Sequence, residues 1–207
     1  TEYDFTLPRR ESKIGRGHRG FQVEVDHEMS VEQAAARRDF TINAIYRCPL
    51  SDTLIDPFEG ESHLRQRVLH CTSDHFAEDP LRVLRGMQFS SRFELIATEE
   101  TLTKSRFLLE ESKDLAQDRI WGEWEKWAVR SRRPSLGLKF LRDSHWLTLY
   151  PELAAIVDVP QDPHWHPEGD VWTHTLHVCD AAADIAEREQ LSKLDRTVLM
   201  FSALCHD

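Results

Sequence analysis

The sequence has no long apolar run, no repeat or low-complexity tract, and no pair of closely spaced cysteines. A membrane-spanning helix needs about 20 consecutive apolar residues, so the short apolar runs predict no transmembrane segment. The N-terminal stretch TEYDFTLPRR does not have the pattern of a signal peptide. The four cysteines are far apart, which predicts free thiols in a reducing compartment. We therefore expect a cytoplasmic protein with no membrane contact.

An excess of basic residues is also missing, since 26 Lys and Arg side chains stand against 36 Asp and Glu, a formal net charge of -10. This balance disfavours non-specific binding to a polyanion. The acidic excess is uneven: residues 107–207 hold 11 basic and 18 acidic side chains, whereas residues 1–50 hold 8 of each. The first half of the chain can therefore still present local basic patches to phosphate groups.

The N-terminal part mixes strand and helix patterns. Alternating or β-rich residues predict strands over 3–8 and 21–25. The intervening residues 9–20 hold three glycines and six basic side chains, which predicts a mobile basic loop. Ser30 to Gln33 fits a capping box that opens a short helix. Residues 53–60 are typical of a strand that runs into a Pro-Gly turn.

From residue 61 onward, helical patterns follow one another with few strand signals between them. We predict the fold class α+β, mainly α, with the tail of an α+β domain followed by an all-helical extension. A chain of 207 residues suits one or two such domains. The predicted helices cover 61–67, 80–93, 98–112, 118–132, 134–143, 149–157, 171–187 and 193–206.

The stretch RRDFTINA, residues 37–44, concentrates hydrogen-bonding side chains between apolar ones. An arginine fork matches phosphate oxygens, and the oxygens of Asp39 and Asn43 can hold a ribose hydroxyl. These residue types are typical of nucleotide binding. The alternative is a helix end with an Arg–Asp surface pair, which contributes little to stability.

The stretch EDPLRVLRGMQFSSRF, residues 78–93, combines a helix start with an arginine stripe. Asp79 is placed to cap the helix and Pro80 to occupy its first position. Two of the arginines, Arg82 and Arg85, share one helical face with Phe89. A solvated arginine face is the simplest interpretation, but it leaves the aromatic residue inside the stripe unexplained.

A second group of candidate ligands lies near the C-terminus. His174 falls on the apolar face of one predicted helix, and His206 and Asp207 end the next. Side chains on two packed helices can converge on a metal ion. Isolated histidines on helices are more often surface or core residues, and we keep that interpretation for His145 and His177.

The motifs RRDFTINA, DPFEG and EDPLRVLRGMQFSSRF, in this order and at these separations, resemble the bacterial class II tRNA nucleotidyltransferases. This family contains the CCA-adding enzymes and the related bacterial poly(A) polymerases. The resemblance implies an enzyme that adds CCA to tRNA 3′ ends from CTP and ATP without a nucleic-acid template. It further implies a nucleotidyltransferase (palm) head over 1–73, a nucleotide- and RNA-binding helical neck over 74–133, and a helical body over 134–207. A poly(A) polymerase shares each of these motifs.

The resemblance assigns roles to six residues of the two motifs. It implies that Asp79 and Arg82 read the edge of the incoming base, because C and A both offer an amine beside an acceptor. Arg38 and Arg85 match residues that contact the nucleotide phosphates. Asp39 and Asn43 match the ribose contacts.

Asp4 matches the third acidic residue of the family's polymerase site. Phosphoryl transfer there needs carboxylates that hold Mg²⁺ against the triphosphate. The family's metal-binding Asp-x-Asp pair would precede Thr1, and the apolar pattern continues up to the last residue. We therefore expect the chain to be a piece of a longer protein and to be inactive by itself.

The C-terminal histidines resemble the opening of an HD phosphohydrolase domain, which some bacterial CCA-adding enzymes carry. The resemblance implies that His174, His206 and Asp207 form part of a site for a divalent transition metal. Two further hypotheses stay open. One is an HD-type phosphohydrolase whose polymerase half is only a tRNA-binding scaffold, and the other is a non-catalytic RNA-binding chain. Departures from the family pattern occur at Glu59, His63 and Asp118.

Overall fold

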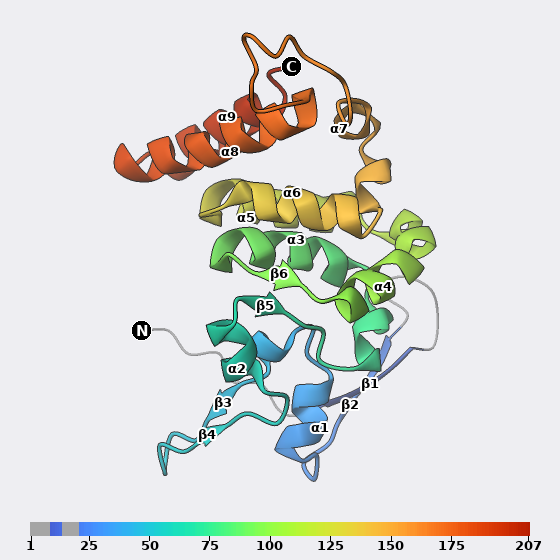
Figure 1. The fold of residues 1–207 in the computed structure, drawn as a ribbon. Helices are drawn as coiled ribbons and strands as arrows, with labels where there is room; N and C mark the ends of the chain where they lie inside the picture. Colours follow the sequence, from blue (N-terminus) through green and yellow to red (C-terminus); the bar gives the residue numbers. More distant parts are fainter. Residues whose placement is uncertain (1–8, 14–20) are drawn as a thin grey trace.

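The computed structural model describes residues 9–13 and 21–207. The strand predicted over 3–8 and the candidate residue Asp4 lie outside these described residues. Figure 1 shows short strands and helices in the N-terminal part, and a stack of helices that leads from α3 to α8 and α9 at the opposite end. The predicted fold class, α+β and mainly α, is confirmed.

The first two strands pair with each other. β1 (Arg9–Lys13) runs antiparallel to β2 (Phe21–Val25), with Arg9 opposite Val25 and Lys13 opposite Phe21. The strand predicted over 21–25 is confirmed, but the loop prediction for residues 9–13 is wrong. The sequence RRESK is polar throughout and has no alternation of apolar and polar residues that would predict a strand. The strand forms nevertheless, because a β-ladder joins backbone groups and does not depend on such a pattern.

Short elements then lead to the first candidate site. The predicted capping box is present: the Ser30 hydroxyl accepts from the Gln33 backbone N–H at the start of α1 (Val31–Ala36). After α1, a 3₁₀ turn η1 (Thr41–Asn43) precedes the antiparallel pair of β3 (Tyr46–Arg47) and β4 (Leu54–Ile55). Helix α2 (Gly60–Arg65) follows the predicted turn.

Three very short strands escaped prediction, β3 and two strands further along the chain. β5 (Val68–Leu69) pairs in parallel with β6 (Ile96–Ala97), and an isolated bridge joins Phe40 to Cys71. Strands of two residues are too short to show a period of two. These pairings hold the residues around Phe40 beside the helix that begins after Pro80.

The predicted helices are confirmed with small shifts at their ends. The segment predicted over 98–112 divides into a helix and a 3₁₀ segment, and the one predicted over 149–157 contains the shorter helix Pro151–Ala155. The elements are η2 (Asp74–Glu78), α3 (Leu81–Phe93), α4 (Glu99–Phe107), η3 (Leu109–Asp114), α5 (Gln117–Arg130), α6 (Pro134–Asp143), η4 (Trp146–Leu149), α7 (Pro151–Ala155), α8 (Val171–Arg188) and α9 (Lys193–Leu204).

The helices form successive layers over a continuous core. α3 packs on α5 and α6, α6 packs on α8, and α9 contacts both α8 and α5. The contact of α3 with α6 is close because of Gly137, where a Cβ would lie 2.4 Å from the Met87 carbonyl oxygen. The core extends from Phe40 through Met87 to Met200. No helix in the described part of the chain is long and apolar enough to cross a membrane. The boundaries of the head, neck and body domains stay a prediction.

Candidate functional site

Asp39 is the centre of the first cluster. Its side chain is only 5% exposed, and its Oδ1 accepts hydrogen bonds from the Phe40 backbone N–H and the Asn43 amide, both at 3.0 Å. Its Oδ2 accepts from Arg85 Nε at 2.5 Å. Burial opposes ionisation of Asp39, but the ion pair with Arg85 and these hydrogen bonds outweigh it and lower the pKa of the carboxyl group. Asp39 is therefore charged, and it fixes both Asn43 and Arg85.

Phe89 supports this ion pair from the next turn of α3. The Arg85 guanidinium carbon lies 5.2 Å from the centre of the Phe89 ring, within the range of a cation–π contact. This contact explains why an aromatic residue, Phe89, lies inside the arginine stripe. Because the Arg85 side chain is 29% exposed, the interpretation of a wholly solvated arginine face is wrong for this residue.

Asp79 divides its carboxylate between two partners. Oδ1 accepts from the Leu81 backbone N–H at 3.0 Å, and Oδ2 pairs with Arg119 Nη2 of α5 at 2.8 Å. The capping bond is as expected, although the helix begins at Leu81, with Pro80 rather than Asp79 at the capping position. Arg119 is a partner that sequence reasoning missed.

Arg82 ties the start of α3 to two preceding segments. Its guanidinium donates to the carbonyl oxygens of His75, at 2.5 Å, and Arg37, at 2.8 Å. Burial lowers the pKa of Arg82, while the carboxylates of Asp39 and Asp79 act in the opposite direction. Those two charges are therefore close enough to Arg82 to affect its titration.

The cluster gathers most of the predicted nucleotide-binding residues, but Arg38 makes a different contact. Its exposed guanidinium lies 6.0 Å from the centre of the Tyr46 ring. We call the gathered set the acid–arginine cluster, and it comprises Asp39, Asn43, Asp79, Arg82, Arg85 and Arg119.

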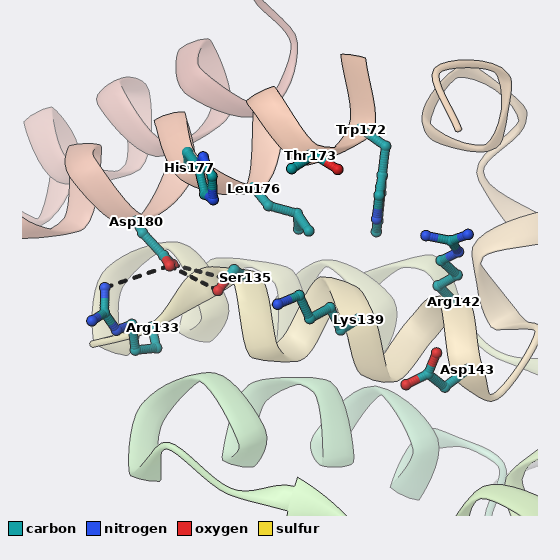
Figure 2. A pocket seen from close by; sticks show the side chains of 10 residues that line it. All are labelled: Arg133, Ser135, Lys139, Arg142, Asp143, Trp172, Thr173, Leu176, His177 and Asp180. Carbon is teal, nitrogen blue, oxygen red and sulfur yellow. Dashed lines mark hydrogen bonds and ion pairs between the residues drawn. The ribbon is translucent and has the colours of Figure 1, made fainter. Parts of the chain in front are cut away.

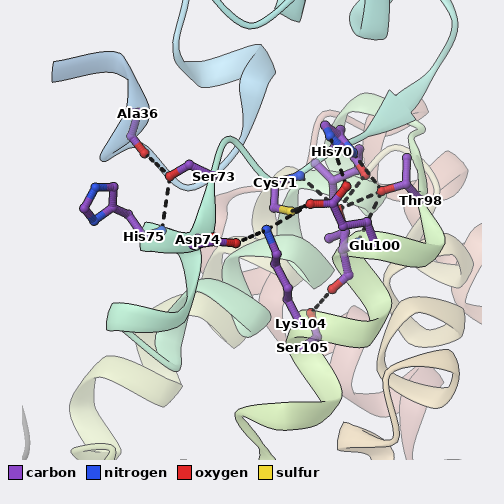
Figure 3. Close-up of polar contacts among 12 residues, drawn as sticks. Ala36, His70, Cys71, Ser73, Asp74, His75, Thr98, Glu100, Lys104 and Ser105 are labelled. Carbon is purple, nitrogen blue, oxygen red and sulfur yellow. Dashed lines mark hydrogen bonds and ion pairs between the residues drawn. The ribbon is translucent and has the colours of Figure 1, made fainter. Parts of the chain in front are cut away.

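A polar network beside this cluster holds the segment that leads into Asp79 (Figure 3). The Ser73 hydroxyl donates to the Ala36 carbonyl oxygen at 2.6 Å. Lys104 Nζ lies 2.9 Å from both Asp74 Oδ1 and Glu100 Oε1. These contacts join η2 to α1 on one side and to α4 on the other.

The second cluster brings His174, His206 and Asp207 together. Asp207 Oδ2 lies 3.4 Å from His206 Nε2 and 4.0 Å from His174 Nε2, and the ligand atoms of the three residues are all within 4.8 Å of one another. His145 and His177, which are both exposed, do not belong to this group.

Glu168 joins this group from the loop between α7 and α8. Its Oε1 accepts from His174 Nδ1 at 2.6 Å and from His166 Nδ1 at 3.2 Å. A hydrogen bond from its own backbone N–H, together with those from His174 and His166, lowers the pKa of Glu168 to about 2. Sequence reasoning missed this residue, although the run HPEGD stands close before His174. We call Glu168, His174, His206 and Asp207 the histidine cluster.

The donor set of His174, His206 and Asp207 suits a divalent transition metal. Bonds of about 2.0–2.2 Å to imidazole and carboxylate ligands place two ligand atoms of one metal about 3–4 Å apart. The separations of 3.4 and 4.0 Å from Asp207 Oδ2 fit this range. His206 Nδ1 donates to the Ala203 carbonyl oxygen at 2.9 Å, so its Nε2 is the nitrogen with a free lone pair.

A cavity of about 560 Å³ lies between α6 and α8 (Figure 2). On its wall, Asp180 accepts from the Ser135 backbone N–H at 3.0 Å and hydroxyl at 2.8 Å, and Arg133 Nη1 lies 3.6 Å away. Asp180 thereby caps α6 from the neighbouring helix. These contacts join the start of α6 to α8.

The succession of short-stranded elements and stacked helices, with the acid–arginine cluster at their junction, defines a protein of the nucleotidyltransferase fold. A solved CCA-adding enzyme structure superimposes with a TM-score of 0.63 over 96% of this chain and 44% of the other, at 20% identity. A tRNA nucleotidyltransferase solved with a primer tRNA and an incoming ATP analogue gives a TM-score of 0.57 over 84% of this chain and 49% of the other, at 25% identity.

Sequence comparison gives the family. The family model described as "Poly A polymerase head domain" matches residues 1–70. Proteins named "Multifunctional CCA protein" from Stenotrophomonas maltophilia and Xylella fastidiosa are each 41% identical over 100% of this chain, which covers 50% and 49% of their length. The chain belongs to the family of bacterial CCA-adding enzymes and poly(A) polymerases, as its motifs predict. It spans about half the length of these curated relatives.

Proposed function

We propose that the complete protein adds CCA to tRNA 3′ ends from CTP and ATP without a nucleic-acid template. The acid–arginine cluster carries this proposal, because it sets an acid, Asp79, and an arginine, Arg82, one helical turn apart at the start of α3. The names of the relatives and the tRNA and nucleotide ligands of the neighbouring structures support the same activity. Mg²⁺ would stabilise the charge on the transferred phosphate group, and Asp4 is our candidate for one of its carboxylate ligands.

In this proposal Asp79 and Arg82 select the base. A carboxylate accepts from the exocyclic amine of C or A, and a guanidinium donates to the adjacent ring nitrogen or carbonyl. U and G present a different order of donors and acceptors at these positions. Binding of the base then competes with the Asp79–Arg119 pair at 2.8 Å, so Arg119 holds the carboxylate in place until a nucleotide arrives.

The remaining residues of the cluster bind the sugar and the phosphates. Asp39 is buried beneath its partners, so we assign it the task of orienting Asn43 toward the ribose and Arg85 toward the phosphates. Arg38, which is exposed beside Tyr46, is a second phosphate contact. Phosphate contacts position a nucleotide without reading its base.

The test is incubation of the complete protein with tRNA that lacks its terminal CCA, with each labelled nucleoside triphosphate supplied separately and in pairs. CCA addition requires CMP incorporation first and AMP incorporation only after it. Continued AMP incorporation on tRNA and on unrelated RNA, without CMP, identifies a poly(A) polymerase instead. The absence of any incorporation contradicts both.

A second candidate function is a metal-dependent phosphohydrolase, favoured by the convergence of His174, His206 and Asp207. These residues would hold a divalent transition metal, which supplies an activated water for attack on a phosphate ester. The test is metal-dependent release of phosphate from terminal phosphomonoesters, and metal-dependent opening of 2′,3′-cyclic phosphodiesters to monoesters, by the complete protein. A rate unchanged by chelation and by His206→Ala overturns this function without touching nucleotide addition.

A further inference from the structure

We propose that Glu168 is a positioning residue of the metal site: it holds His174 in the tautomer whose Nε2 faces His206 and Asp207. This inference rests on the proposed metal site and adds to it a residue outside the three ligands. The loop that carries Glu168 lies at the same end of the molecule as the C-terminus (Figure 1).

The hydrogen bonds of the two histidines carry the inference. A neutral imidazole has one N–H and one lone pair, so the partner of one nitrogen decides which lone pair is free for a metal. His206 Nδ1 is occupied by the Ala203 carbonyl oxygen at 2.9 Å, and His174 Nδ1 by Glu168 Oε1 at 2.6 Å. Both histidines therefore direct Nε2 toward Asp207.

The same distance argues against Glu168 and His174 Nδ1 as ligands of one metal. Two ligand atoms bonded to one ion at about 2.0–2.2 Å lie about 3 Å or more apart in tetrahedral and octahedral sites. A separation of 2.6 Å is instead that of a hydrogen bond between an imidazole and a carboxylate. Glu168 acts on the site through His174.

The backbone around Glu168 is built to hold it there. Asp170 Oδ1 caps α8 through the Thr173 N–H at 3.0 Å, and its Oδ2 accepts from the Asp158 N–H at 2.8 Å, so one carboxylate closes the loop at both ends. Gly169, between Asp170 and Glu168, has φ +128°, a conformation that side chains disfavour. The chain can thus turn sharply between the cap and the carboxylate that faces His174.

The experiment has two readouts on the complete protein. Imidazole ¹⁵N chemical shifts at pH 8 without metal report the tautomer of His174, and calorimetric titration with Mn²⁺ reports metal affinity. Glu168→Ala should move His174 away from the pure Nδ1–H tautomer and weaken Mn²⁺ binding about 10- to 100-fold, the usual loss for a residue that orients a metal-binding histidine. Glu168→Gln keeps an acceptor oxygen and should fall between Glu168→Ala and wild type.

Two controls separate this inference from the proposed site itself. Glu187→Gln removes a carboxylate from the same helix as His174. It should leave the His174 tautomer unchanged and the Mn²⁺ affinity within about threefold of wild type. His206→Ala should abolish the Mn²⁺ binding step that belongs to the histidine cluster, if the site exists, and leave binding at the proposed polymerase site in place. If His206→Ala leaves the affinity unchanged, the proposed metal site is wrong.

If His206→Ala abolishes binding while both Glu168 variants keep wild-type affinity and tautomer, the role of Glu168 is wrong and the metal site stands. A fall in the number of bound ions in Glu168→Ala, with the affinity of the remaining ion unchanged, also overturns the inference, because it makes Glu168 a ligand of a second ion. Thermal melts of each variant identify any loss of folded protein.

Discussion

The acid–arginine cluster and the histidine cluster differ in how their polar atoms are used. In the first, Asp39 binds two neighbouring side chains and a backbone N–H, and Asp79 binds Arg119 and the helix start. In the second, the Nε2 atoms of His174 and His206 meet around one carboxylate, Asp207, at distances beyond a hydrogen bond. In the first cluster the carboxylates are paired with groups of the protein itself. In the second, the ligand atoms are spaced as around a bound cation.

This difference predicts where each cluster obtains its rigidity. Buried ion pairs fix geometry as long as both partners are present, and the loss of one partner leaves an uncompensated charge. A metal site gains its order from the ion that it binds, which stabilises the folded state by mass action. Substitutions in the first cluster should therefore affect folding directly, and substitutions in the second should affect folding only when metal is present.

The largest expected effect follows Arg85→Ala. This variant strands the buried Asp39 carboxylate, and breaking such a pair costs about 3–5 kcal/mol in the free energy of unfolding. Urea denaturation at pH 7 measures the loss. Arg38→Ala, which changes the charge equally at an exposed position, should cost less than about 0.5 kcal/mol.

The pH dependence of this effect has a defined sign. The pKa of Asp39 is lowered in the folded state, so its contribution is present above the unfolded value of about 3.9 and is lost as the pH falls through the folded value. The stability difference between wild type and Arg85→Ala should be full at pH 7 and should shrink below about pH 4. A difference that grows on acidification contradicts the assignment of a charged Asp39.

The next effect concerns the histidine cluster. Mn²⁺ at 100 times its dissociation constant should stabilise the protein by about 2.7 kcal/mol, and a thermal melt with and without the ion measures this. His206→Ala should remove the part of the shift that the histidine cluster contributes and leave the melt without metal nearly unchanged, while CCA addition persists. The matched control is His177→Ala, an exposed histidine on the same helix as His174, which should keep the full shift.

The smallest effect belongs to the polar network beside the first cluster. Lys104 bridges Asp74 and Glu100, both of which are exposed, so Lys104→Ala should cost only about 0.2–1 kcal/mol and less at high salt. Lys113→Ala removes a fully surface-exposed pair with Glu110 and should cost even less. Equal losses of several kcal/mol for both variants would mean that surface pairs, not the buried cluster, maintain this region.

The sequence predicted the helices and the candidate residues better than it predicted their partners. Helix starts such as Ser30 and the run from Pro134 have local signals, and the helices of the stack lie where the apolar period placed them. The bonds of Asp79 to Arg119 and of Asp39 to Arg85 join residues 40 and 46 positions apart. No local spacing contains that information, because packing of α3 against α5 and against the segment after α1 creates it.

Polar or very short elements were missed for a related reason. The strand over Arg9–Lys13 shows no alternation, and two-residue strands such as Val68–Leu69 show no period at all. Glu168 lies in a loop, and the turn at Gly169 and the cap at Asp170 place its side chain toward His174. The candidate ligand His174 could be predicted from the sequence. Glu168, which we propose orients it, could be identified only from the structure.

The most direct test of the proposed nucleotide selection is kcat/KM for each of the four nucleoside triphosphates with wild type and Asp79→Ala, on tRNA that ends before CCA. Losing the capping bond should cost about 1 kcal/mol of stability. Losing one base-edge partner should cost about 1–3 kcal/mol of discrimination, so the preference for CTP and ATP over UTP and GTP should fall about 5- to 150-fold. If Asp79→Ala lowers the melting temperature but leaves the nucleotide ratios unchanged, Asp79 is only a helix cap and the acid–arginine cluster does not select the base.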